Sequence, residues 1–293
     1  MKLGIINDEV SQNIEDVIRF AKNYSLNGVE IRSINNLDID KLSFWDIMKI
    51  KKMLDDAGLE VCNISSSFFK CSIDVKNEYD DNIRKLRKLI KISHYLGCNS
   101  IRGFSFFKDE INNFEKKFDE IVEKFWEPLK IIESEGITLL LESDPSVFTT
   151  NHKKLAKLIS TLNSKNVKAI YDPGNDLYDP DGEIPYPDGF NFIKNFIKHV
   201  HIKDVKKVNG KPECVKFGTG DIQYSQIFRA LNVYGYNGYI VLETHYRLGI
   251  KISQNLLKKP GGNEFSYGGE DASKESIVEL KKLILPYVQK FEE

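Results

Sequence analysis

The amino-acid sequence predicts an α/β protein, a single (β/α)8 barrel that spans residues 1–293. Strand-like and helix-like segments alternate along the chain, and this alternation favours a parallel sheet. Eight such units follow one another without a break in composition, which suits a closed barrel. The turn after the first strand, Asn7–Gln12, lacks glycine, whereas a doubly wound nucleotide-binding sheet normally has a glycine-rich turn there. The barrel is therefore preferred over the doubly wound sheet.

The predicted strands are short apolar runs, and the predicted helices have apolar residues at helical spacing. The strands are 3–6, 28–32, 59–65, 98–104, 137–142, 167–172, 199–203 and 239–243. The helices are 13–24, 44–57, 78–96, 111–135, 152–162, 190–197, 224–234 and 274–291. Glycine follows three of these helices, at Gly58, Gly97 and Gly136, as expected for helix C-termini. Pro128 is expected to kink the fourth helix.

Composition and charge exclude several classes of protein. The 42 basic and 43 acidic residues leave a net charge of −1, which argues against a nucleic-acid or anionic-membrane partner. No run approaches the roughly 18 apolar residues of a transmembrane helix, and no leader precedes the first strand. Four cysteines without CxxC spacing are typical of reduced thiols. We expect a soluble, cytoplasmic protein.

Four residues stand at or near the ends of successive predicted strands. Glu142, Asp172, His201 and Glu243 are separated by 30, 29 and 42 residues. One strand–helix–strand unit takes about 30 residues, and neighbouring strands lie roughly 4.8 Å apart. A single charged residue at such a position often only caps the next helix. Four on consecutive strands instead predict side chains that converge on one cation at the barrel rim.

The chemistry of this set indicates the kind of cation and reaction. Three carboxylates and one imidazole suit Mn²⁺, Mg²⁺ or Co²⁺ better than a closed structural zinc site. Four ligands leave two octahedral positions for neighbouring oxygens of a substrate. A metal on a carbonyl and the adjacent hydroxyl stabilises the enediolate that forms when a base removes the proton between them. Glu142 and Glu243 would then face each other across the substrate as an acid–base pair.

Six segments together resemble the xylose-isomerase-like TIM-barrel superfamily, which includes tagatose 3-epimerase, inosose dehydratase and metal-dependent apurinic endonucleases. They are GVEIR, LLLE, YDPGN, HVHIKD, FGTGDI and GYIVLETH. The resemblance implies that Glu142, Asp172, His201 and Glu243 bind the metal and that both glutamates transfer protons. Epimerases of this group commonly have histidine three residues after the aspartate, but this chain has Asn175. An amide can bind a hydroxyl but cannot carry a proton.

Six side chains are predicted to bind substrate. They are Asn175, Lys203, His245, Arg247, Arg102 and Phe68. Strand alternation points Lys203 to the same side as His201, although Lys203 could instead pair with Asp204. His245 and Arg247 could contact a hydroxyl or acid group of the substrate, or they could be loop residues without a role in binding.

Arg102 could bind an anionic group or form an ion pair with Glu142 or Glu30. The Phe-rich loops Ser65–Lys70 and Gly103–Phe107 predict an apolar pocket wall, a buried loop anchor or a subunit contact of a homo-oligomer. His199 is expected to begin a strand and not to bind the metal.

The predicted function is therefore a divalent-metal-dependent isomerase or epimerase of a sugar, most simply with Mn²⁺, or with Mg²⁺, Co²⁺ or Zn²⁺. The partner is a small carbohydrate. A lyase or dehydratase acting on a keto-polyol or keto-glycoside is the main alternative, which Asn175 keeps open. An apurinic endonuclease would need more than the five histidines present and a basic surface. A non-catalytic ligand-binding barrel is disfavoured by the four intact metal ligands.

Overall fold

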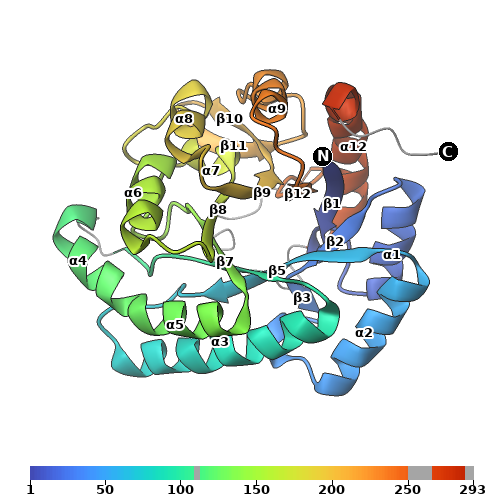
Figure 1. Cartoon of the computed structure of the whole chain (residues 1–293). Helices are drawn as coiled ribbons and strands as arrows, with labels where there is room; N and C mark the ends of the chain where they lie inside the picture. The colour runs from blue at the N-terminus through green and yellow to red at the C-terminus, as the bar shows by residue number, and fades with distance from the viewer. Residues whose placement is uncertain (109–112, 250–265, 288–293) are drawn as a thin grey trace.

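Eight parallel strands close into a barrel, which confirms the predicted (β/α)8 fold (Figure 1). The computed structural model describes residues 1–108, 113–249 and 266–287. Around the barrel the order is β1–β12–β9–β8–β7–β6–β5–β2. The strands are β1 (Lys2–Ile6), β2 (Gly28–Ile31), β5 (Glu60–Phe68), β6 (Ser100–Gly103), β7 (Thr138–Glu142), β8 (Val167–Tyr171), β9 (Ile197–Ile202) and β12 (Tyr239–Leu242).

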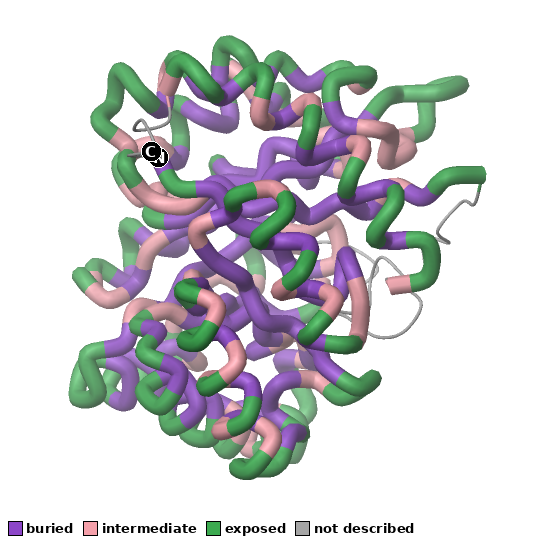
Figure 2. Tube along the Cα trace, turned by 90° about the vertical axis from the view of Figure 1, so that its right-hand side faces the viewer, coloured by how far each residue is buried: buried purple, intermediate pink, exposed green. Residues whose placement is uncertain are grey.

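Helices surround the barrel, with buried inner faces and exposed outer faces (Figure 2). The longer helices are α1 (Ile14–Asn23), α2 (Phe44–Asp56), α3 (Lys76–Leu96), α4 (Phe114–Lys124), α5 (Trp126–Glu135), α6 (His152–Leu162), α9 (Tyr224–Val233) and α12 (Gly269–Ile284). The strand residues that face the helices and the apolar stripes of the helices form the main core. None of the helices in the described ranges is long and apolar enough to cross a membrane.

Local sequence signals explain where several helices begin and end. The Asn13 side chain accepts a hydrogen bond from the Glu15 amide at the start of α1. Ser43 and Asp46 form a reciprocal capping box at the start of α2. Gly97 and Gly136 follow α3 and α5 with φ of 71° and 67°, a conformation that favours glycine.

The predicted helix 111–135 is two helices where the structure describes it. α4 ends at Lys124 and α5 begins at Trp126, so Pro128 lies in the first turn of α5. The predicted kink takes the form of a break at Phe125, because Pro128 has no N–H to donate to the carbonyl four residues earlier and its ring crowds that carbonyl. Residues 111–112 of the predicted helix, and 288–291 of the last one, lie outside the described residues.

Several short elements follow the strands, and of these only the helix at Phe190 was predicted. The hairpin β10 (Asp204–Val208) and β11 (Lys211–Val215) turns at Asn209 and Gly210, which have φ of 52° and 76°. The others are β3 (Ser33–Ile34), β4 (Leu37–Asp38), α7 (Pro173–Asp176) and α8 (Phe190–Ile193). α8 ends four residues before the predicted helix does, because β9 already begins at Ile197.

Candidate metal centre and active site

The four residues predicted to share a cation lie together at the C-terminal end of the barrel. Glu142 ends β7, Asp172 follows β8, His201 lies in β9 and Glu243 follows β12. All four are at most 3% exposed. One ligand atom from each lies within 4.8 Å of one from every other. A cation could therefore contact all four side chains.

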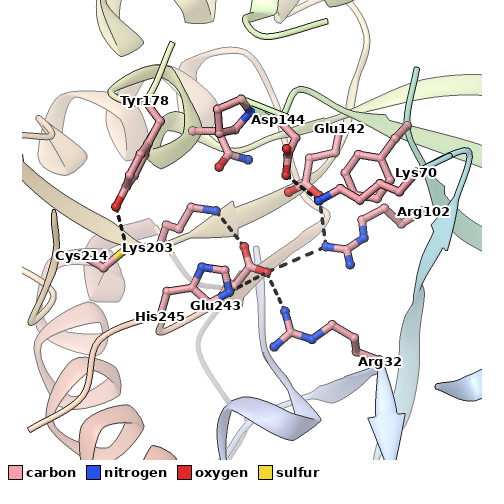
Figure 3. Close-up of a pocket in the computed structure, with 13 residues that line it drawn as sticks. Arg32, Lys70, Arg102, Glu142, Asp144, Tyr178, Lys203, Cys214, Glu243 and His245 are labelled. Atoms are coloured by element: carbon pink, nitrogen blue, oxygen red, sulfur yellow. Dashed lines mark hydrogen bonds and ion pairs between the residues drawn. The ribbon is translucent and has the colours of Figure 1, made fainter. Parts of the chain in front are cut away.

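Three cationic side chains contact this cluster (Figure 3). The Lys203 Nζ atom donates to Asp172 at 2.5 Å and to Glu243 at 2.9 Å. Arg102 Nη1 lies 3.1 Å from Glu142 and 3.8 Å from Glu243. Of the two partners suggested for Arg102, the structure thus selects Glu142.

Arg32 is the third cation, and the sequence analysis did not single it out. Its Nη1 atom donates to Glu243 at 2.9 Å. Its other nitrogens contact Asp8 and Glu9, both buried in the turn after β1. The signal that could have identified Arg32 is its position directly after β2, in the segment GVEIR.

His201 lies between two carboxylates. Its Nδ1 atom is 2.9 Å from Glu142, and its Nε2 atom is 3.1 Å and 3.2 Å from the two oxygens of Glu30. Burial lowers the pKa of His201, but Glu30 and Glu142 raise it more, to about 10. His199 does not begin the strand as predicted, because β9 begins at Ile197, and its Nε2 atom lies 2.8 Å from Glu30.

The acids of the cluster differ in how readily they ionise. Burial raises the pKa of Glu142 and Glu243, but nearby positive charge outweighs it in both. His201 and Arg102 hold the pKa of Glu142 below its usual value. Lys203 is the main positive charge that holds the pKa of Glu243 well below its usual value. Burial raises the pKa of Asp172 to about 6 despite Lys203. Both glutamates are therefore ionised at neutral pH and can accept a proton.

His245 and Arg247 occupy different places. His245 lines the cavity beside the cluster, with its Nε2 atom 3.3 Å from Glu9 and 3.5 Å from Glu243. Burial lowers its pKa to about 4, so the ring is neutral, and its φ of 43° lies in the left-handed region. Arg247 is buried, donates to Glu9 at 3.1 Å and is not among the described lining residues.

The cavity has a volume of about 50 Å³. Its described lining consists of Arg32, Lys70, Arg102, Phe104, Glu142, Asp144, Pro145, Asn175, Tyr178, Lys203, Cys214, Glu243 and His245. Sites for drug-sized ligands measure about 300 Å³ or more, so a sugar would have to move some of these side chains. Asn175 lies in the lining and donates to the Ser143 carbonyl at 2.8 Å.

The Phe-rich loops contribute one ring to the cavity. Phe104 lines it, and Lys70 Nζ lies 4.5 Å from the ring centre while donating to Asp144 at 2.7 Å. The structure does not bring Phe68 to the cavity; it is fully buried and stacks on Phe69 at 4.0 Å. The sequence analysis missed Lys70, Asp144, Pro145, Tyr178 and Cys214, although Lys70 and Asp144 each stand two residues after a strand end.

The charges around the cluster suit a divalent cation. Among the described residues, the connected network contains six buried carboxyl groups and four side chains with a permanent positive charge. The acids are Asp8, Glu9, Glu30, Glu142, Asp172 and Glu243, and the bases are Arg32, Arg102, Lys203 and Arg247. Without a cation His201 is protonated, because its pKa is about 10; once His201 gives up that proton to bind a cation, the described part of the network has two excess negative charges, which one divalent cation would balance. Donor chemistry and charge thus both fit such an ion.

The sequence is similar to a known family and to individual proteins of known name. A family model described as "Xylose isomerase-like TIM barrel" matches residues 18–278. Inosose dehydratase of Klebsiella pneumoniae strain 342 is 24% identical over 220 residues, which cover 66% of this chain and 72% of that protein. Inosose dehydratase of Glaesserella parasuis is 26% identical over 225 residues, which cover 68% of this chain and 74% of that protein.

Solved structures share the fold. The probable 3-DHS dehydratase AsbF of Bacillus anthracis has a TM-score of 0.73 at 17% identity and covers 96% of this chain and 99% of its own. An L-ribulose 3-epimerase has a TM-score of 0.72 at 16% identity, and the match covers 97% of this chain and 95% of that one. The IOLI protein, whose structure holds a zinc atom, has a TM-score of 0.71 at 16% identity, covering 99% and 100%.

Proposed function

The chain belongs to the xylose isomerase-like TIM-barrel family, and we propose that it is a metal-dependent sugar isomerase or epimerase. It would move a proton at the carbon next to the carbonyl of a sugar or a related polyol. Glu142, Asp172, His201 and Glu243 would hold the divalent cation. When bound, the cation acts as a Lewis acid toward substrate oxygens.

One observation carries this proposal: two ionised glutamates face the same cavity from well-separated strands. Glu142 ends β7 and Glu243 follows β12, and two strands, β8 and β9, lie between them in the barrel. Both line the cavity, and Arg102 Nη1 lies 3.1 Å from an oxygen of Glu142 and 3.8 Å from an oxygen of Glu243. A substrate carbon between them would meet a proton acceptor on each side. One glutamate removes the proton, and the same or the other group returns it.

The surrounding cations support the development of negative charge on the substrate. Removal of a proton next to a carbonyl places that charge on oxygen, and Lys203 and Arg102 both line the cavity as buried donors. Fixed positive groups in a site with little water stabilise such charge without reorganisation. Neutral His245 and Asn175 also line the cavity and could bind hydroxyl groups.

Dehydration is a second candidate, supported by one substitution and by the relatives. Asn175 cannot carry a proton, unlike the histidine common at this position in epimerases. The similar inosose dehydratases suggest a keto-polyol from which the same proton removal is followed by loss of a neighbouring hydroxyl. The two reactions share the removal of the proton. In epimerisation a proton is then returned to the carbon, whereas in dehydration a neighbouring hydroxyl group is lost.

Deuterium exchange tests the proposal. The protein with Mn²⁺ is incubated in D₂O with a panel of ketoses and keto-inositols, and NMR locates the exchanged carbon. We expect deuterium next to the carbonyl of one substrate, together with an epimer, an isomer or a dehydrated product that identifies the reaction. Glu142→Gln and Glu243→Gln should each slow exchange by roughly 10²–10⁴-fold. Glu60→Gln, at an exposed glutamate on β5, should not. Normal exchange by either active-site variant would overturn the mechanism.

A further inference from the structure

We propose that Glu30 is a positioning residue that fixes the orientation of His201 and the nitrogen it offers to the cation. Glu30 would hold the proton of His201 on Nε2, which leaves the Nδ1 lone pair directed at the cluster of Glu142, Asp172 and Glu243. This inference rests on the proposed role of His201 as a metal ligand. It adds a residue from β2, which supplies none of the four ligands.

The two ring nitrogens of His201 face different surroundings. Nδ1 lies 2.9 Å from Glu142 and 4.0 Å from Glu243, on the side of the proposed cation. Nε2 lies 3.1 Å and 3.2 Å from the oxygens of Glu30, on the opposite edge of the ring. A histidine that binds a metal through one nitrogen commonly donates its other N–H to a carboxylate. Glu30 occupies the place that such a carboxylate takes.

Glu30 reaches His201 through the interior of the barrel. β2 and β9 are not neighbours, because β1 and β12 lie between them. Glu30 is 0% exposed, and a buried carboxylate is expensive unless its oxygens are hydrogen-bonded. Here Asn63 Nδ2 donates to one oxygen at 3.0 Å, and His199 Nε2 lies 2.8 Å from the other. Asn63 in turn accepts from Ser100 Oγ at 2.8 Å.

A substitution at Glu30 can distinguish a role in orienting His201 from a role in packing. The donors from β5 and β9 hold the carboxylate of Glu30 in place before it meets His201. Glutamine has nearly the same shape, so Glu30→Gln keeps the packing. Its amide nitrogen, however, is a donor, and it would meet another donor in either orientation, Asn63 Nδ2 in one and His199 Nε2 in the other. A residue that only fills space would tolerate this change without an effect on the cation.

Metal affinity and histidine NMR test the inference. Titration calorimetry with Zn²⁺ should show affinity reduced by about 10–100-fold in Glu30→Gln, the usual effect of losing such a partner. His199→Gln changes one contact to Glu30 and the edge-to-face ring contact to His201 at 5.3 Å, but it keeps the carboxylate of Glu30 beside His201, so it should reduce affinity by less. Long-range ¹⁵N–¹H spectra of histidine-labelled wild type, which has five histidines, report the tautomer directly. We expect His201 with Zn²⁺ to carry its proton on Nε2 and to coordinate through Nδ1.

The outcomes separate this inference from the proposed function. Wild type that binds Zn²⁺ through His201 Nε2, or a folded Glu30→Gln protein with wild-type affinity, would overturn the role of Glu30 and leave the metal site standing. Wild type that binds no divalent cation would overturn both. If Glu30→Gln does not fold, the wild-type spectrum alone decides, because it needs no variant.

Discussion

Lys203 holds two of the proposed metal ligands together when the cation is absent. Its ammonium group contacts Asp172 at 2.5 Å and Glu243 at 2.9 Å, and all three side chains are at most 5% exposed. Removing one partner of a buried ion pair costs about 3–5 kcal/mol, because the remaining charges stay uncompensated. Unfolding of a protein of this length has an entropy of roughly 0.6 kcal/mol/K, so Lys203→Met should lower the metal-free Tm by about 5–8 °C.

A divalent cation should reverse much of this loss. In wild type the cation competes with the ammonium group for Asp172 and Glu243, whereas in Lys203→Met it meets two carboxylates without that competitor, although Glu243 keeps its contact to Arg32. Thermal unfolding in EDTA and in Mn²⁺ should therefore show a larger metal-induced rise in Tm for Lys203→Met than for wild type. Lys206→Met, at an exposed position on β10, serves as the control and should change stability by less than about 0.5 kcal/mol. Equal Tm values of Lys203→Met and wild type in EDTA would refute the reasoning.

Three further predictions concern pH, the aromatic core and a loop. Although burial lowers it, Glu30 and Glu142 raise the pKa of His201 to about 10, so cation binding must displace a proton. Calorimetry should therefore show Mn²⁺ affinity rising about tenfold per pH unit between pH 6.5 and 8.5, and a flat profile would contradict this. Phe69 is fully buried and stacks on Phe68 and Phe106, so Phe69→Ala should lower the free energy of unfolding by about 3–5 kcal/mol in urea; a loss below 1 kcal/mol would contradict the packing. Asp204 accepts hydrogen bonds from the amides of Gly218 and Gly220 at 2.9 Å each. Asp204→Ala should therefore lower the free energy of unfolding by about 1–3 kcal/mol and speed amide hydrogen exchange at both glycines. Unchanged exchange would exclude this role of Asp204.

The barrel could be predicted because its signals are local and repeated. Apolar runs and helical spacing recur eight times, and α6 has the predicted bounds, His152–Leu162. The hairpin of β10 and β11 was missed because its strands are short and mostly polar, although Asn209–Gly210 is a strong turn signal. The interruption before α5 could be predicted from Pro128, but whether proline bends one helix or separates two depends on packing.

The candidate site could be predicted only in part, for a related reason. The rule that parallel strands end at one rim was enough to bring Glu142, Asp172, His201 and Glu243 together. The ion pairs of Arg32 with Glu243, and of Glu30 with His201, join strands that are far apart in the chain. Their partners depend on side-chain reach across the barrel, which strand spacing does not determine.

Crystals of the protein soaked in Mn²⁺ test the central claim most directly, because anomalous scattering locates the ion without reference to activity. We expect one strong peak bonded to Glu142, Asp172, His201 and Glu243, with Lys203 Nζ moved away from Asp172. Crystals with no peak at this position, in which Lys203 still bridges Asp172 and Glu243, would contradict it.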